Sequence, residues 1–155
     1  MKIVLVEPEI PPNTGNVARL CAATRSVLHL IEPFGFKLDD TRLKRAGMDY
    51  WQQVEWHRWR DWGAFESAHL RDAARFWFIE SGGPALYTEA AFGPDDYLIF
   101  GRETAGLPKK LLEANRARWL RIPMFNERSR SLNLSNCAAL VLFEALRQQG
   151  FRNQV

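Results

Sequence analysis

Three segments of the sequence carry polar residues that could hold a ligand or position a reacting group. The first runs from Pro11 to Arg19, where Asn13, Asn16 and Arg19 are spaced three residues apart. In the first turns of a helix this spacing predicts that the three side chains share one face. The two amides could fix a loop by local hydrogen bonds, with Arg19 as a fixed cation beside it. A helix cap followed by a solvated arginine explains these residues equally well.

The second segment runs from Phe100 to Pro108 and combines two glycines with one acid. Gly101 would let the backbone turn sharply or approach a ligand closely. Glu103 is a single carboxylate, which favours a hydrogen-bond acceptor over one half of a catalytic acid pair. The glycine spacing matches neither the dinucleotide-binding fingerprint nor the phosphate-binding loop, so neither ligand class is supported.

The third segment is Ile122-Pro123-Met124 followed, after a short insertion, by residues 130–136. Four compact polar side chains stand immediately before or at the start of an apolar helical pattern, namely Ser131, Asn133, Ser135 and Asn136. One of them could cap the helix. Four exceed what a single cap requires, so we expect some of them to contact a ligand.

Several other kinds of site are poorly supported. The histidines His29, His57 and His69 lie outside the three segments, so a Ser-His-Asp arrangement is not indicated. The spacing of a metal site is absent as well. Cys21 and Cys137 lie within apolar helical patterns and are best interpreted as small buried hydrophobic residues.

Charge and hydropathy narrow the function classes. The chain has 155 residues and a net charge of +3, and five arginines lie between positions 116 and 130 against one acid. Such a cluster could bind phosphate, or it could be a solvated surface with ordinary ion pairs. No apolar run reaches the length of about 20 residues that a membrane span needs, and the N-terminus does not resemble a signal peptide. We therefore expect a cytoplasmic protein that neither spans nor binds a membrane.

Alternating strand and helix patterns must position these segments. Apolar runs predict strands at 2–6, 27–32, 76–79, 97–100 and 119–122, with a short strand at 54–56. Helical patterns cover 16–25, 61–72, 108–112 and 134–149, and a short helix follows Asp39 and Asp40. Residues 81–96 are expected to be mostly loop with one helical turn. The order predicts an α/β fold around a parallel sheet in one domain, residues 1–155. The three segments then lie at the carboxyl ends of strands, where such sheets bind ligands.

Taken in this order, the three segments resemble the SPOUT class of RNA 2′-O-methyltransferases. Residues 12–19, 99–107 and 122–136 are similar to its three motifs, and the likeness runs from Met1 to about Phe151. Segments 6–16 and 45–50 and the short length resemble the minimalist tRNA wobble-nucleotide group. The resemblance implies a parallel sheet flanked by helices whose C-terminal part forms a deep trefoil knot, which periodicity alone would not predict.

The resemblance also implies a cofactor, S-adenosylmethionine, bound without metal in the knot loops of a homodimer. The implied cofactor-binding residues are Phe78, Gly101, Ile122, Met124, Ser131 and Leu132. Segment 125–129 is one residue longer than expected for the group, which leaves the register of this loop open.

The resemblance further assigns roles at the reacting centre. Arg19 of one subunit would lie near the cofactor of the other and orient the ribose hydroxyl. An ordinary guanidinium stays protonated, so orientation and phosphate anchoring are favoured over a role as base. Ser131 and Asn133 would position the ribose or the arginine, and Glu103 would hold a hydrogen bond. The implied RNA-binding residues are Asn13, Asn16, Arg19 and Arg130.

The leading hypothesis is therefore 2′-O-methylation of the wobble cytidine or modified uridine, position 34, with the tRNA anticodon stem-loop as partner. A methyltransferase of another tRNA or ribosomal RNA position is the alternative in the same class. A non-catalytic knotted RNA-binding module and a flavodoxin-like nucleotide binder are alternatives from other classes. Arg19, Glu103, Ser131 and Asn133 are all present, which argues against the non-catalytic module.

Overall fold

The computed structural model describes residues 1–38, 50–129 and 131–152. The short helix expected after Asp39 and Asp40 lies outside the described residues. So do Arg130 and, except for Tyr50, the 45–50 segment that resembles the wobble-nucleotide group.

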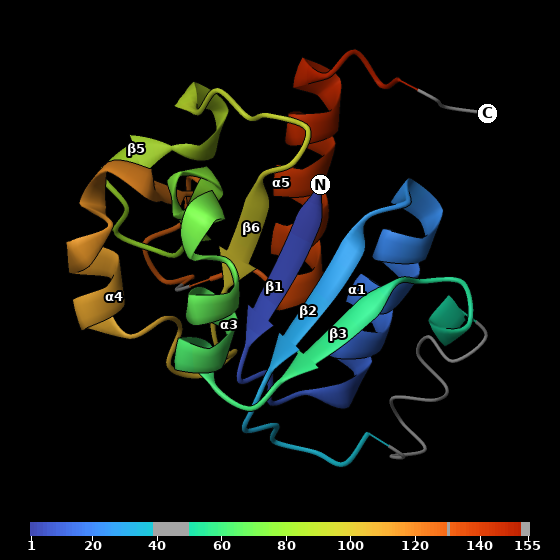
Figure 1. Cartoon of the computed structure of the whole chain (residues 1–155). Coiled ribbons are helices and arrows are strands. Elements are labelled where there is room, and N and C mark those ends of the chain that lie inside the picture. The colour runs from blue at the N-terminus through green and yellow to red at the C-terminus, as the bar shows by residue number, and fades with distance from the viewer. Residues whose placement is uncertain (39–49, 130, 153–155) are drawn as a thin grey trace.

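Within the described residues, seven strands form one sheet in which every neighbouring pair is parallel. Across the sheet their order is β3-β2-β1-β6-β4-β7-β5. Figure 1 shows β3, β2, β1 and β6 side by side in this order. Chain order reverses between β1 and β6, which is the point where sheets of this kind open a ligand crevice. The strands are β1 (Lys2–Val6), β2 (Val27–Ile31), β3 (Trp56–Trp59), β4 (Phe76–Ile79), β5 (Ala85–Leu86), β6 (Tyr97–Phe100) and β7 (Trp119–Arg121).

Helices cover both faces of this sheet. Figure 1 shows α1 and α5 on one side and α3 on the other. The α-helices of the described residues are α1 (Pro11–Thr24), α3 (Trp62–Ala68), α4 (Lys109–Ala114) and α5 (Leu134–Gln148). Short 3-10 helices are η1 (Leu70–Arg75), η2 (Tyr87–Glu89) and η3 (Arg116–Arg118). In the described residues, no helix is long and apolar enough to cross a membrane.

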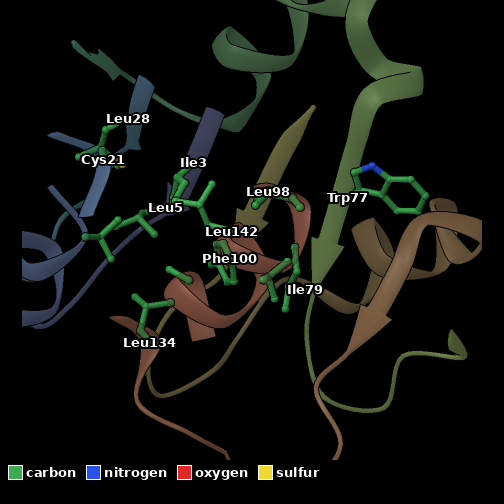
Figure 2. Packing of buried hydrophobic residues seen from close by; sticks show 14 of the residues in the cluster. Ile3, Leu5, Cys21, Leu28, Trp77, Ile79, Leu98, Phe100, Leu134 and Leu142 are labelled. Carbon is green, nitrogen blue, oxygen red and sulfur yellow. The ribbon is translucent and has the colours of Figure 1, made fainter. Parts of the chain in front are cut away.

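Two apolar clusters fill the space between the sheet and its helices. Alternate residues of the central strands point to opposite faces, and both faces are buried, as parallel sheets require. One cluster joins β1 and β6 to α1 and α5, and Figure 2 shows Ile79 and Phe100 close to Leu142 of α5. The other joins the same strands to Phe65 of α3 and Leu112 of α4.

The longest helix, α5, begins and ends as its sequence predicts. The Asn133 side chain accepts a hydrogen bond from the Ser135 amide at 2.9 Å and so caps the first turn. At the other end Gly150 adopts a positive φ of 69°, and the Phe151 amide donates back to the Leu146 carbonyl at 3.0 Å. This pattern is the glycine-dependent helix end expected at Gly150.

The sequence misplaced the start of α1, which begins at Pro11 rather than at Asn16. Proline lacks an amide N–H and its φ suits a first helical turn, so Pro11 and Pro12 open the helix instead of preceding it.

Other boundaries differ where the periodic pattern is weak. The predicted strand at 54–56 lies instead at Trp56–Trp59, an edge strand that is largely exposed and shows no apolar alternation. The predicted helix at 61–72 is divided into α3 and η1. In the predicted loop 81–96, the helical turn is present as η2, but β5 was missed because two residues are too few for a periodic signal.

Candidate functional site

A cleft of about 630 Å³ opens at the carboxyl ends of β4, β6 and β7, close to the start of α1 and α5. Residues of all three segments that the sequence analysis singled out for their polar side chains line this cleft. The lining residues are Ile10, Asn13, Ile79, Glu80, Ser81, Phe100, Gly101, Arg102, Glu103, Thr104, Ala105, Gly106, Ile122, Met124, Ser131, Leu132, Asn133, Leu134 and Cys137.

The loop after β6 forms one wall of the cleft and depends on two glycines. Arg102 and Gly106 close the loop by backbone hydrogen bonds of 3.3 and 2.9 Å. A Cβ at Gly101 would lie 2.2 Å from the Gly106 carbonyl carbon, so no side chain fits there. Gly106 has a φ of +66°, and a Cβ there would lie 2.1 Å from a carboxylate oxygen of Glu80. The glycines therefore permit close backbone packing within the wall.

Glu103 ties this loop to the start of α1. Its carboxylate accepts hydrogen bonds from the amides of Glu9 and Ile10, at 2.8 and 3.1 Å, and from the Asn13 side chain at 3.1 Å. Both amides precede Pro11, the first residue of α1, so the carboxylate of a distant loop fixes the chain that leads into the helix. In return, the Glu9 carboxylate accepts from the Thr104 amide at 2.9 Å.

Asn133 extends these contacts to α5. Its side-chain amide donates to the Asn13 side-chain oxygen at 2.8 Å, while its own oxygen caps α5. Asn13 is only 5% exposed. We call Asn13, Glu103 and Asn133 the amide–carboxylate network. It links the three segments by hydrogen bonds between residues that lie 90 and 120 positions apart.

The charges of the cleft favour a cationic or neutral ligand over a polyphosphate. Glu80 and Glu103 contribute carboxylates, whereas the lining cation, Arg102, forms an ion pair with Glu7. The Glu80 carboxylate also accepts from the Leu107 amide at 2.9 Å, which fixes it in the wall. Burial raises the pKa of the Cys137 thiol to about 11, and Glu80 adds to the shift, so the thiol stays protonated at neutral pH.

The cleft collects most of the residues for which the sequence predicted a role. Of the predicted cofactor residues it is lined by Gly101, Ile122, Met124, Ser131 and Leu132. Of the predicted catalytic and RNA-binding residues, the cleft is lined by Asn13, Glu103, Ser131 and Asn133.

Phe78 does not reach the cleft, contrary to its predicted role in the cofactor wall. It is fully buried on the opposite face of the sheet, in the cluster that contains Phe65 and Phe76. Its neighbour Ile79 lines the cleft instead. Because side chains of a strand alternate between faces, an error of one residue moves the assignment to the wrong side of the sheet.

Asn16 and Arg19 lie on the exposed face of α1, outside the lining of this cleft. The guanidinium carbon of Arg19 lies 5.1 Å from the centroid of the Tyr50 ring. The predicted common face with Asn13 is wrong, because Asn13 is buried while the other two are exposed. Each step of three residues turns about 60° short of a full helical turn, so Asn13 and Arg19 end about 120° apart.

Glu80 and Thr104 were not singled out from the sequence. Glu80 directly follows the apolar strand 76–79, and a carboxylate at the carboxyl end of a buried strand is a signal that could have indicated it. Two of the five clustered arginines make contacts within the fold and so are not free to form a phosphate-binding face. Arg121 donates to the Gly83 carbonyl at 2.7 Å, and Arg118 stacks over Trp77 at 4.5 Å.

The three histidines come together on the opposite side of the sheet, within an aromatic cluster. The ring of His29 lies 5.2 Å from that of His57 and 5.3 Å from that of His69, and its Nδ1 accepts from Trp59 Nε1 at 3.0 Å. His29 is 4% exposed, and burial, with the neighbouring histidines, lowers its pKa to about 3. Among the described residues, no group of three or more His, Cys, Asp or Glu could hold a metal ion.

Comparison with known proteins gives matches over nearly the whole chain. The model of the SpoU rRNA methylase family matches residues 1–143. A tRNA (cytidine(34)-2′-O)-methyltransferase of Burkholderia ambifaria is 52% identical over 151 residues, 96% of each chain. A structure solved in a study of 2-OH methylation of C/U34 on tRNA has a TM-score of 0.90 at 44% identity, covering 97% of both chains.

A more distant structure resembles this chain in fold alone. It is the SpoU methyltransferase AviRb of Streptomyces viridochromogenes in complex with AdoMet, with a TM-score of 0.84 at 24% identity, over 97% of this chain and 61% of that one.

Proposed function

Because the chain belongs to the SpoU rRNA methylase family, we propose that it transfers a methyl group from S-adenosylmethionine to the ribose 2′-hydroxyl of cytidine or modified uridine 34 of tRNA. The observation that carries the proposal is the amide–carboxylate network, which joins all three motif segments around one cleft. The relative from Burkholderia ambifaria, which matches over 96% of both chains, supports position 34 as the target.

The residues of the cleft fit this cofactor. The volume of about 630 Å³ lies in the usual range for small-molecule sites. Ile79, Ile122 and Leu132 supply apolar walls that suit an adenine ring, and Glu80 and Glu103 supply negative charge that suits a cationic ligand. When bound, the cofactor supplies a methyl group already activated on a positively charged sulfur. The match to the SpoU rRNA methylase family over residues 1–143 supports a methyl-group donor in this cleft.

The chain's own residues would then bind and orient the ribose. Ser131 and Asn133 stand at the cleft with side chains that can hydrogen-bond to ribose hydroxyls. Glu103 is a positioning residue, because its carboxylate holds Asn13 and the start of α1. Keeping the hydroxyl in line with the methyl group supplies much of the rate enhancement in a reaction of this kind.

Arg19 would complete the site from a second subunit. An apolar groove on α5, lined by Leu132, Asn136, Ala139, Leu140 and Phe143, adjoins the cleft through Leu132. A partner subunit bound in this groove would border the cleft. Arg19 is exposed on α1 and does not line the cleft of its own chain, so it is available to reach the cleft of a partner. Because a guanidinium stays protonated, Arg19 would orient the hydroxyl and anchor a phosphate. Asn16, exposed on the same helix, would contact the anticodon stem-loop.

The proposal includes a C-terminal trefoil knot and a single methyltransferase domain over residues 1–155. What supports the knot is the match of the chain to the SpoU rRNA methylase family, whose fold the resemblance described above expects to be knotted. One sheet with both faces covered supports a single domain. A tRNA substrate makes the cytoplasm the expected compartment.

Label transfer tests the proposal directly. The protein is incubated with methyl-labelled S-adenosylmethionine and either bulk tRNA or ribosomal RNA, and the RNA is digested with nuclease and mapped by mass spectrometry. We expect a 2′-O-methyl group at nucleotide 34. Label at another tRNA position, or label in ribosomal RNA alone, would retain the chemistry but reject the target. Bound cofactor with no label in any RNA would favour a binding module without catalytic activity.

A further inference from the structure

Phe125 is the most exposed of the large hydrophobic side chains in the described residues, at 98% exposure. It follows Met124, which lines the cleft, so it stands at the cleft's edge. The described part of the chain does not cover its ring. A fully hydrated phenyl ring contributes no packing energy to the fold, which suggests that it contacts something outside the chain.

The chain on either side of Phe125 is held in place. Pro123 precedes it by two residues. After it, the Asn126 side chain accepts from the Arg128 amide at 3.0 Å, and the Asn126 carbonyl accepts from the Ser129 amide at 2.9 Å. The ring therefore projects from the base of a hydrogen-bonded turn beside the cleft, which lowers the entropy lost when it binds a partner.

The surroundings of Phe125 favour RNA over a second copy of the chain. Its next neighbours are Asn126, Glu127 and Arg128, which are polar and exposed, whereas the centre of a subunit interface is apolar. Phe125 is also absent from the lining of the apolar groove on α5. Proteins that read unpaired RNA stack its bases on exposed aromatic rings, with arginines close by for the phosphates.

We infer that Phe125 stacks on an unpaired base of the anticodon loop and so holds the target nucleotide over the cleft. The inference rests on the proposed function, and it assigns Phe125 a positioning role. Stacking requires a flat ring, so an aliphatic side chain of similar size cannot replace it. The neighbouring Arg128 is placed to contact the phosphate backbone of the same loop.

Three substitutions separate stacking from simple apolar contact. Phe125→Ala removes the ring, Phe125→Leu keeps apolar bulk without a ring, and Phe125→Tyr keeps the ring. We expect the alanine and leucine variants to lower kcat/KM for an anticodon stem-loop RNA by about 10- to 100-fold, mostly through KM, and the tyrosine variant to match the wild type. Leu70→Ala is the matched control, since Leu70 is 69% exposed. It lies in η1, which precedes the amino end of β4, whereas the cleft lies at the carboxyl ends of the strands.

Two further measurements guard the interpretation. Calorimetry should give the same cofactor affinity for all variants, and sedimentation should give the same oligomeric state. A leucine variant as active as the wild type overturns stacking, and a change of oligomeric state in the alanine variant assigns Phe125 to a subunit contact instead. A wild-type protein that methylates no tRNA contradicts the proposed function itself, and the inference falls with it.

Discussion

The two sides of the sheet gather polar groups of different kinds. At the cleft, the amide–carboxylate network joins three loops, and histidine is absent from the lining. On the other side, His29, His57 and His69 lie among aromatic rings, and His29 is buried in its neutral form. All three histidines are thus held away from the cleft. The candidate site is therefore identified by side chains that hydrogen-bond to one another across three loops, and not by the histidines.

The largest effect should come from Arg19, which lies on α1 beyond the cleft. Arg19→Ala should lower kcat for methyl transfer by about 100-fold or more if, as proposed, this side chain reaches the reacting centre of a second subunit. Cofactor affinity, measured by calorimetry, should not change. Arg71→Ala is the control, since Arg71 is also exposed but lies in η1, before β4. Unchanged turnover in Arg19→Ala would remove Arg19 from the catalytic arrangement.

A smaller effect should follow from neutralising the network itself. Glu103 accepts three hydrogen bonds, and Glu103→Gln offers one acceptor oxygen and an amide that faces donors. We expect the free energy of unfolding to fall by about 1.5–3 kcal/mol, measured by urea denaturation. Glu113→Gln, in an exposed ion pair with Lys109, should change it by less than about 1 kcal/mol. Equal losses in the two variants would mean that the network adds no special stability.

At neutral pH, the smallest effect is expected on the histidine side of the comparison. The unfolded chain binds a proton at His29 below about pH 6.5, whereas the folded protein does so only below a pKa of about 3. Lowering the pH through this window therefore lowers the free energy of unfolding, by up to about 1.4 kcal/mol per pH unit.

The variant His29→Gln removes this titration, so its unfolding free energy should fall less steeply with decreasing pH. Its methyl transfer at neutral pH should stay within about twofold of the wild type, because distant sites act independently. Identical pH slopes for variant and wild type would contradict the pKa of His29, and a large loss of turnover would contradict the separation of the two sides.

The central strands and long helices were predictable because burial imposes a regular apolar pattern on them. The runs at 2–6, 76–79 and 97–100 coincide with β1, β4 and β6. The edge strands β3 and β5 were misplaced or missed, since exposed or very short strands carry no such pattern. Gathering Asn13, Glu103 and Asn133 at one cleft required only the rule that parallel strands place their carboxyl ends together.

What failed in the site prediction was orientation around an element. Phe78 was assigned to the wrong face of β4, and Asn13 was placed on the same face of α1 as Arg19. In β4, an error of one residue reverses the face to which the side chain points. In α1, six residues leave Asn13 and Arg19 about a third of a helical turn apart. The sequence also lacked any signal for the hydrogen bonds that Thr104 donates to the Glu9 carboxylate, which join residues 95 positions apart.

The network also has a consequence for the order in which the protein is made. The Ile10 amide, which directly precedes α1, donates to Glu103, and the Asn13 side chain accepts from Asn133. On the ribosome, Asn13 emerges long before either partner has been synthesised. The start of α1 can therefore reach its final hydrogen bonding only when most of the chain has left the exit tunnel. Long sequence separation slows such steps, so we expect the ligand-binding end of the sheet to be completed last.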